Sequence, residues 1–282
     1  MRDALYRVVQ DAWSAWLARS RAADFAAVER FLLFVGYPRS GHSLIGAALN
    51  AHRDAVVAHE LDAPPLILAG CSRDELYARL LARAQWFHLR GDRSNYSYRV
   101  PGAWQGRFSR LRVIGDKRGG SVTRCLARQP DFLERVRALT GVPLRLIHVV
   151  RNPFDNIAAI ALWERRTLAD AAGYYFELCA TTARLPELCR AGELVTVRHE
   201  QFLADPSASL VRLCSFLGLE PEPAWLEQCR AIVFAHPTHT RTRVEWAPAL
   251  VREVERRAAA FPHLAGYGFT LDEGGEKRTK LG

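Results

Sequence analysis

The chain of 282 residues carries 39 Lys and Arg against 30 Asp and Glu, and 49% of its residues are hydrophobic. This composition can build a core and excludes a disordered chain. No apolar run approaches the roughly 20 residues that a membrane span needs, and no signal peptide is visible, so we expect a cytoplasmic protein without a membrane span. The net charge of +9 fits an anionic partner without choosing among nucleic acid, a membrane face and a nucleotide.

Charged and apolar residues alternate at helical spacing in the N-terminal segment over 1–30, which we expect to be helical. Short apolar runs then alternate with helical patterns, which is typical of a mostly parallel sheet covered on both faces. We therefore predict a single α/β domain over 1–282, a three-layer α/β/α sandwich with a disordered tail over 270–282. The expected strands span 31–35, 55–58, 111–114, 144–150 and 194–197, the expected helices include 73–89, 205–218 and 249–260, and a long loop is expected over 91–110.

Residues 36–43 (GYPRSGHS) join the first expected strand to a helix with the spacing of a P-loop, so the fold is expected to be P-loop-like. Backbone N–H groups at such a turn and the positive end of the helix form an anion cradle. Ser40 and Ser43 add hydroxyl groups. His42 stands where an ATP-binding loop has its lysine, and the positive side chain lies within the loop at Arg39.

Two other functions fit parts of the pattern. A P-loop nucleotide kinase or hydrolase with a degenerate Walker A loop needs a lysine and a magnesium carboxylate, for which Asp116 is the nearest candidate. A nucleic-acid-binding module would use the basic surface and the aromatic segment 96–108. No RNA or DNA motif is present, so no nucleic acid is expected beyond a nucleotide donor. The six cysteines lack zinc-ligand spacing, and no metal site is expected.

The segment YPRSGHSL resembles the 5'-phosphosulfate loop of sulfotransferases that use 3'-phosphoadenosine-5'-phosphosulfate (PAPS). Residues 150–155 (VRNPFD) resemble the 3'-phosphate motif of that family, and 197–202 (VRHEQF) with 216–219 (FLGL) resemble its third motif, in the family order. The resemblance covers about residues 31–220. It implies an enzyme that moves the sulfuryl group of PAPS to an acceptor hydroxyl by in-line transfer, leaves 3',5'-ADP and needs no metal.

The resemblance also implies roles for residues that would hold the donor. Arg151 would bind the 3'-phosphate, which suits a bidentate guanidinium. Ala159 stands where the family usually has a second 3'-phosphate ligand, a serine, so either that contact is missing or Asn152 or Asn156 supplies it. His199 replaces a more usual tyrosine. The residues implied to hold the 5'-phosphosulfate are Arg39, Ser40, Gly41, His42 and Ser43, and Arg241 and Arg243 are candidates to close over the nucleotide.

Sulfuryl transfer needs a base for the acceptor proton and a positive group at the departing oxygen. The position of Glu60 after the second expected strand is similar to that of the catalytic glutamate in protein-tyrosine sulfotransferases, and His59 and Asp62 are the alternatives for the base. Lys117, after the third expected strand, and Arg39 are the candidates for the leaving group.

The acceptor is left open by the sequence: a small-molecule, lipid, sugar or peptide hydroxyl is equally compatible with the motifs. Tyr96, Tyr98, Trp104 and Trp163 are aromatic residues that line an acceptor pocket or belong to the core.

Overall fold

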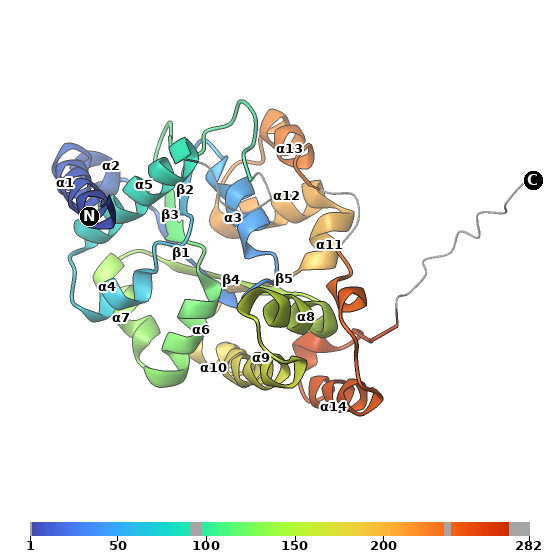
Figure 1. The fold of residues 1–282 in the computed structure, drawn as a ribbon. Helices are drawn as coiled ribbons and strands as arrows, with labels where there is room; N and C mark the ends of the chain where they lie inside the picture. The colour runs from blue at the N-terminus through green and yellow to red at the C-terminus, as the bar shows by residue number, and fades with distance from the viewer. Residues whose placement is uncertain (1, 91–97, 234–237, 271–282) are drawn as a thin grey trace, which may run out of the picture.

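The computed structural model describes residues 2–90, 98–233 and 238–270. All strands of these residues form one parallel sheet in the order β2-β3-β1-β4-β5, which confirms the predicted α/β class (Figure 1). The strands are β1 (Arg30–Gly36), β2 (Ala55–Ala58), β3 (Val113–Asp116), β4 (Leu144–Val150) and β5 (Leu194–Arg198).

The third strand begins two residues later than predicted. Leu111 is buried and therefore looks like a strand residue, but the carbonyl of Arg112 accepts hydrogen bonds from the Glu29 and Arg30 backbone N–H groups before the ladder starts. The register then pairs Arg30 with Val113. Burial alone does not separate a ladder residue from the buried residue that precedes it.

The central strand is apolar on both sides because helices cover both faces of the sheet. Phe31, Leu33 and Val35 of β1 pack into one core cluster, whereas Leu32 and Phe34 pack into the cluster on the opposite face. A third cluster forms between helices beyond the end of β4. Together these clusters produce the three-layer arrangement visible in Figure 1.

The face of the sheet that carries Phe31, Leu33 and Val35 is covered by α1 (Arg2–Ser20), α2 (Ala22–Ala26), α4 (Ala63–Leu68), α5 (Arg73–Arg90), α6 (Gly119–Arg128), α7 (Phe132–Thr140) and α10 (Leu185–Leu188). The opposite face is covered by α3 (His42–Asn50), α11 (His199–Ala204), α12 (Pro206–Leu217) and α13 (Pro223–Arg230). The third cluster is built by α8 (Pro153–Glu164), α9 (Leu168–Thr182) and α14 (Pro248–Ala258), while η1 (Thr240–Arg243) and η2 (Pro262–Leu264) are short 3-10 turns.

The polar motifs follow the carboxyl ends of the strands, where parallel sheets bind ligands. The phosphate loop follows β1, Glu60 follows β2, Lys117 follows β3 and Arg151 follows β4. The sheet therefore brings together four segments that are far apart in the sequence.

The loop predicted over 91–110 is confirmed over 98–110, which contains no helix or strand, and residues 91–97 lie outside the described residues. Nearly all of the predicted tail over 270–282 also lies outside the described residues, so the extent of the domain toward residue 282 stays a prediction. Within the described ranges, no helix is both long enough and apolar enough to cross a bilayer.

Candidate active site

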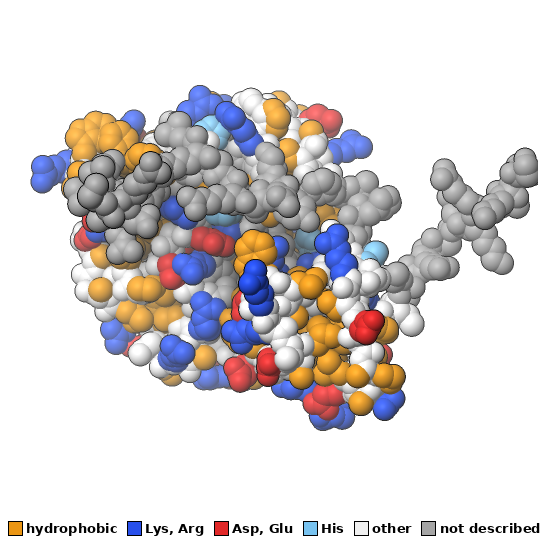
Figure 2. All heavy atoms as spheres, viewed as in Figure 1, with side chains coloured by type: hydrophobic (Ala, Val, Ile, Leu, Met, Phe, Trp, Pro, Cys, Tyr) orange, Lys and Arg blue, Asp and Glu red, His pale blue; other side chains and the backbone are white. Residues whose placement is uncertain are grey.

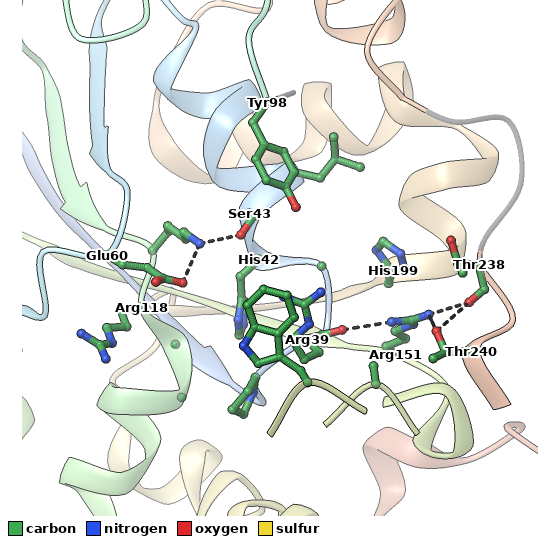
Figure 3. Close-up of a pocket in the computed structure, with 18 of the residues that line it drawn as sticks. Arg39, His42, Ser43, Glu60, Tyr98, Arg118, Arg151, His199, Thr238 and Thr240 are labelled. Carbon is green, nitrogen blue, oxygen red and sulfur yellow. Dashed lines mark hydrogen bonds and ion pairs between the residues drawn. The ribbon is translucent and has the colours of Figure 1, made fainter. Parts of the chain in front are cut away.

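A pocket of about 830 Å³ opens at the carboxyl edge of the sheet (Figure 3). Lys and Arg side chains, interspersed with Asp and Glu, gather on the face that carries α6 (Figure 2). The pocket lining itself is strongly basic. Its cations are Arg39, Lys117, Arg118, Arg124, Arg151 and Arg243, and its carboxylates are Glu60 and Glu164.

The phosphate loop turns sharply before α3. Gly41 is the N-cap of α3 with φ 103°, and a Cβ there would lie 2.3 Å from Nδ1 of His199, so only glycine fits. Arg39 has φ 67°, a left-handed conformation that is costly for a residue with a side chain. Ser40 is fully buried and donates its hydroxyl proton to the Tyr37 carbonyl across 2.9 Å, so this hydroxyl supports the loop and does not line the pocket.

The His42 ring does not supply the positive charge that the lysine of a P-loop supplies. Its ring is buried, and Nε2 donates to the Val35 carbonyl across 3.3 Å. A Cβ on Gly119 would lie 2.5 Å from the ring, so the α6 terminus approaches it closely. Burial, with a smaller effect of Lys117, lowers the pKa of His42 to about 4. The ring is therefore neutral at pH 7, and the loop receives its positive charge from elsewhere.

Lys117 provides a positive charge to the pocket beside the phosphate loop. Its Nζ donates to Oε1 of Glu60 across 2.8 Å and to Oγ of Ser43 in the loop (Figure 3). Its side chain is 3% exposed. Gly46 of α3 leaves room for it, because a Cβ there would lie 3.0 Å from Cβ of Lys117. The predicted base and leaving-group residues thus meet beside the loop.

Glu60 occupies a left-handed turn with φ 60°, and its side chain is 48% exposed. Partial burial raises the pKa of this carboxyl, but the charge and hydrogen bond of Lys117 outweigh burial and hold the pKa at about 2. The carboxylate is therefore ionised, and its proton affinity is low for as long as Lys117 is paired with it.

Asp116 builds the turn that presents Glu60. Its buried carboxylate accepts the backbone N–H groups of Leu61, Asp62 and Ala63 at 3.1, 2.9 and 3.0 Å. Both oxygens support the turn and Asp116 does not line the pocket, so the structure does not place it as the magnesium ligand that a kinase would need. Burial raises its pKa, although the three N–H groups oppose that shift. The sequence feature that could have indicated this supporting role is the position of Asp116 as the last residue of β3, next to the turn that follows β2.

The two alternative bases, His59 and Asp62, are less well placed than Glu60 to take a proton in the pocket. His59 lines the pocket, but its ring stacks on Phe87 with centroids 3.6 Å apart. Asp62 pairs with Arg118 across 3.0 Å and does not line the pocket.

Arg151 lies at the other end of the pocket (Figure 3). The side chain is buried, and its guanidinium donates to the Arg39 carbonyl at 3.1 Å, to the Thr240 hydroxyl at 3.0 Å and to the Thr238 carbonyl. These acceptors are neutral, and no ion pair among the described residues includes Arg151. Burial lowers its pKa, while the more distant Asp155 opposes that shift. A buried cation without a carboxylate partner fits an anionic ligand.

The residues expected to compensate for Ala159 are engaged elsewhere. Asn152 caps α8 through the Phe154 N–H at 3.0 Å, and the amide of Asn156 donates to the Pro38 carbonyl at 2.7 Å. Neither residue lines the pocket, whereas Ala159 and Thr240 do. The structure therefore places the Thr240 hydroxyl, which the sequence analysis missed, beside Arg151.

The two C-terminal candidates, Arg241 and Arg243, occupy different environments. Arg243 lines the pocket. Arg241 does not line it: its guanidinium forms a buried pair with Asp155, with Nη2 2.9 Å from Oδ2, and donates to the Gly268 carbonyl at 2.7 Å. Arg241 thus anchors the segment around η1 to α8, which the TRTR sequence does not reveal because either arginine could face inward.

Two of the four aromatic candidates line the pocket. Tyr98 and Trp163 belong to the lining, and the Arg39 guanidinium carbon lies 4.4 Å from the Trp163 ring centroid. Trp104 is absent from the lining residues described, and Tyr96 lies outside the described residues.

Comparison with known proteins identifies the class. The profile of the Sulfotransferase family matches residues 32–223, about two thirds of the chain, and the chain therefore belongs to this family. The protein is a sulfotransferase, as the motifs predicted, and the kinase alternative is set aside. No protein of curated function matches the chain.

Solved structures agree in fold. The sulfotransferase domain from the curacin biosynthetic pathway is 16% identical, with a TM-score of 0.50 over 83% of this chain and 96% of that chain. Sulfotransferase STF1 from Mycobacterium tuberculosis H37Rv is 12% identical, with a TM-score of 0.50 over 88% of this chain and 82% of that chain. At such identities the comparison shows a shared fold alone.

Proposed function

We propose that this sulfotransferase uses PAPS as its donor, that Glu60 is the base for the acceptor hydroxyl, and that Lys117 stabilises the leaving group. The observation that carries the donor assignment is the buried Arg151 guanidinium, whose acceptors among the described residues are all neutral although the pocket is strongly basic. A nucleotide with a separate 3'-phosphate would give this cation a partner while its 5' end reaches the loop.

The residues present fit the 5' end of that donor as well. The N-terminus of α3 follows Gly41, and its backbone N–H groups with the Ser43 hydroxyl form an anion cradle. His42 contributes through its backbone in this proposal, since its ring is neutral and buried. Arg243 and the Thr240 hydroxyl would complete the 3'-phosphate end beside Arg151.

PAPS supplies a sulfuryl group whose bond to the 5'-phosphate oxygen breaks as the acceptor oxygen forms a new bond to sulfur. Glu60 takes the proton of the acceptor hydroxyl. Lys117 donates a hydrogen bond toward the oxygen that receives the electron pair of the broken bond, and Arg39 adds positive charge at the same loop. The products are a sulfated acceptor and 3',5'-ADP.

The Lys117–Glu60 pair links donor binding to base strength. While Nζ lies 2.8 Å from Oε1 of Glu60, the pKa of the carboxyl stays at about 2 and the base is weak. When Lys117 turns toward the donor, Glu60 loses its cation and its pKa rises, because burial then dominates. The base would therefore gain strength after the donor is in place.

The direct test of the donor is ligand-dependent thermal unfolding followed by an activity screen. We expect 3',5'-ADP to raise the unfolding midpoint and ATP with Mg²⁺ to raise it much less at equal concentration, because a ligand stabilises the folded state in proportion to its affinity. Labelled PAPS would then be offered with phenolic, aliphatic, sugar and peptide hydroxyls. Equal stabilisation by both nucleotides would refute the donor assignment.

A further inference from the structure

Arg39 and Trp163 form a cation–π pair inside the pocket. The guanidinium carbon lies 4.4 Å from the indole centroid, and both residues belong to the pocket lining. Trp163 is 64% exposed, which is unusual for so large an apolar side chain. The pair therefore lies at the open side of the phosphate loop and is not part of the core.

The arginine needs such a partner. Its backbone is held in a left-handed turn with φ 67°, and within the described residues no ion pair holds its guanidinium. A free arginine side chain loses roughly 2 kcal/mol of rotamer entropy when it is fixed in one conformation. The indole ring offsets part of that loss in advance, since a cation over an aromatic face is attracted to it.

The position of the ring follows from α8. Ala159 and Trp163 are four residues apart on this helix, so they share one face, and both line the pocket. Ala159 offers no hydroxyl and little bulk one turn before the indole. The helix ends just beyond it, with Arg165 in a left-handed C-cap at φ 55°. This face of α8 therefore presents an aromatic surface to the loop.

We infer that Trp163 is a positioning residue that holds the Arg39 guanidinium toward the sulfuryl group. The inference rests on the proposed function of the pocket. It assigns the ring no contact with the reacting atoms: Trp163 acts through Arg39. Since 3',5'-ADP lacks the sulfuryl group, the effect should appear in kcat and not in affinity for that product.

The experiment compares Trp163→Ala with Trp163→Phe, which keeps an aromatic face. We expect kcat with PAPS to fall roughly 3- to 30-fold in Trp163→Ala and to stay within about twofold of the wild type in Trp163→Phe. The Kd for 3',5'-ADP, measured by calorimetry, and the unfolding midpoint should be unchanged in both. The matched control is Trp104→Ala, because Trp104 is 38% exposed and also faces an arginine, Arg107 at 5.7 Å, but does not line the pocket.

A double-mutant cycle tests whether the ring acts through the arginine. In an Arg39→Gln background, Trp163→Ala should cause no further loss of kcat. The inference is overturned if Trp163→Ala has wild-type kcat, if its loss is undiminished in that background, or if affinity for 3',5'-ADP falls in parallel. A wild-type protein that neither binds 3',5'-ADP nor turns over PAPS would instead refute the proposed function, whatever the variants do.

Discussion

Nζ of Lys117 lies 2.8 Å from Oε1 of Glu60, and this pair joins the ends of two neighbouring strands. Ala58 of β2 is the ladder partner of Asp116 of β3, so the chain places Lys117 one residue, and Glu60 two residues, beyond a paired position. Parallel pairing explains why two residues far apart in the sequence meet. One contact thus holds the proposed base and the residue proposed to stabilise the leaving group in a resting state.

The first prediction is that Glu60→Gln and Lys117→Ala each reduce kcat by about 10²- to 10⁴-fold, the range for removal of a general acid or base. Binding of 3',5'-ADP should change little in Glu60→Gln, because the carboxylate serves the acceptor proton. Initial rates with PAPS and calorimetry with 3',5'-ADP measure the two effects. Glu164→Gln is the control: this carboxylate also lines the pocket but pairs with Arg166 across 2.7 Å. Normal turnover in Glu60→Gln would rule out its role.

The second prediction concerns pH. The free enzyme holds the pKa of Glu60 at about 2, so kcat/KM should show no acid limb from this group until pH approaches that value. In the proposed donor complex Lys117 turns toward the donor, so the acid limb of kcat should lie at higher pH. Lys117→Gln should also raise the limb of kcat/KM, because burial raises the pKa and the largest opposing charge is gone, which leaves only the weaker effects of His59 and Arg118. Coincident acid limbs in kcat and kcat/KM would contradict the proposed exchange.

Sequence patterns predicted the sheet and the four loops at its edge because apolar runs and strand ends are encoded locally. They did not predict the direction of individual side chains. His42 looks like a loop ligand, yet its ring turns inward because Gly119 leaves space for it. Arg241 and Arg243 are indistinguishable in sequence, and only the buried Asp155 selects between them. Such choices depend on contacts between segments distant in the chain.

The third prediction distinguishes the roles of the two buried arginines Arg151 and Arg241. Arg151→Gln should weaken 3',5'-ADP binding by roughly 10- to 150-fold, the value of a charged hydrogen bond, while an analogue without the 3'-phosphate loses much less. Arg241→Gln should instead lower the unfolding midpoint, since it leaves Asp155 buried without its cation. Calorimetry with both nucleotides and thermal unfolding distinguish the outcomes. Equal losses for both nucleotides in Arg151→Gln would argue against a 3'-phosphate contact.

The fourth prediction tests the turn that carries Glu60. In Asp116→Asn an amide group replaces one carboxylate oxygen, so either Leu61 or both Asp62 and Ala63 lose the acceptor of their backbone N–H. We expect about 1–3 kcal/mol of lost stability and a lower kcat, with 3',5'-ADP affinity retained. Chemical denaturation and initial rates measure both. A variant with full stability and reduced 3',5'-ADP affinity would show that Asp116 serves the donor rather than the turn.

The fifth prediction follows from the buried ring of His42. The unfolded chain binds a proton with a pKa of 6.5, whereas the folded protein binds it with a pKa of about 4. Stability from the neutral ring is therefore complete above pH 6.5 and is lost as pH falls toward about 4, by roughly 3 kcal/mol for this one group.

His42→Gln removes this titration. The free energy of unfolding of the variant should depend less steeply on pH between about 6.5 and 4 than that of the wild type, as measured by urea denaturation at several pH values. A residual slope is expected, because burial also lowers the pKa of His148, His199 and His263. Equal slopes for the two proteins would mean that the His42 ring is not held neutral by burial, and the loop would then carry the charge that this structure assigns to Lys117.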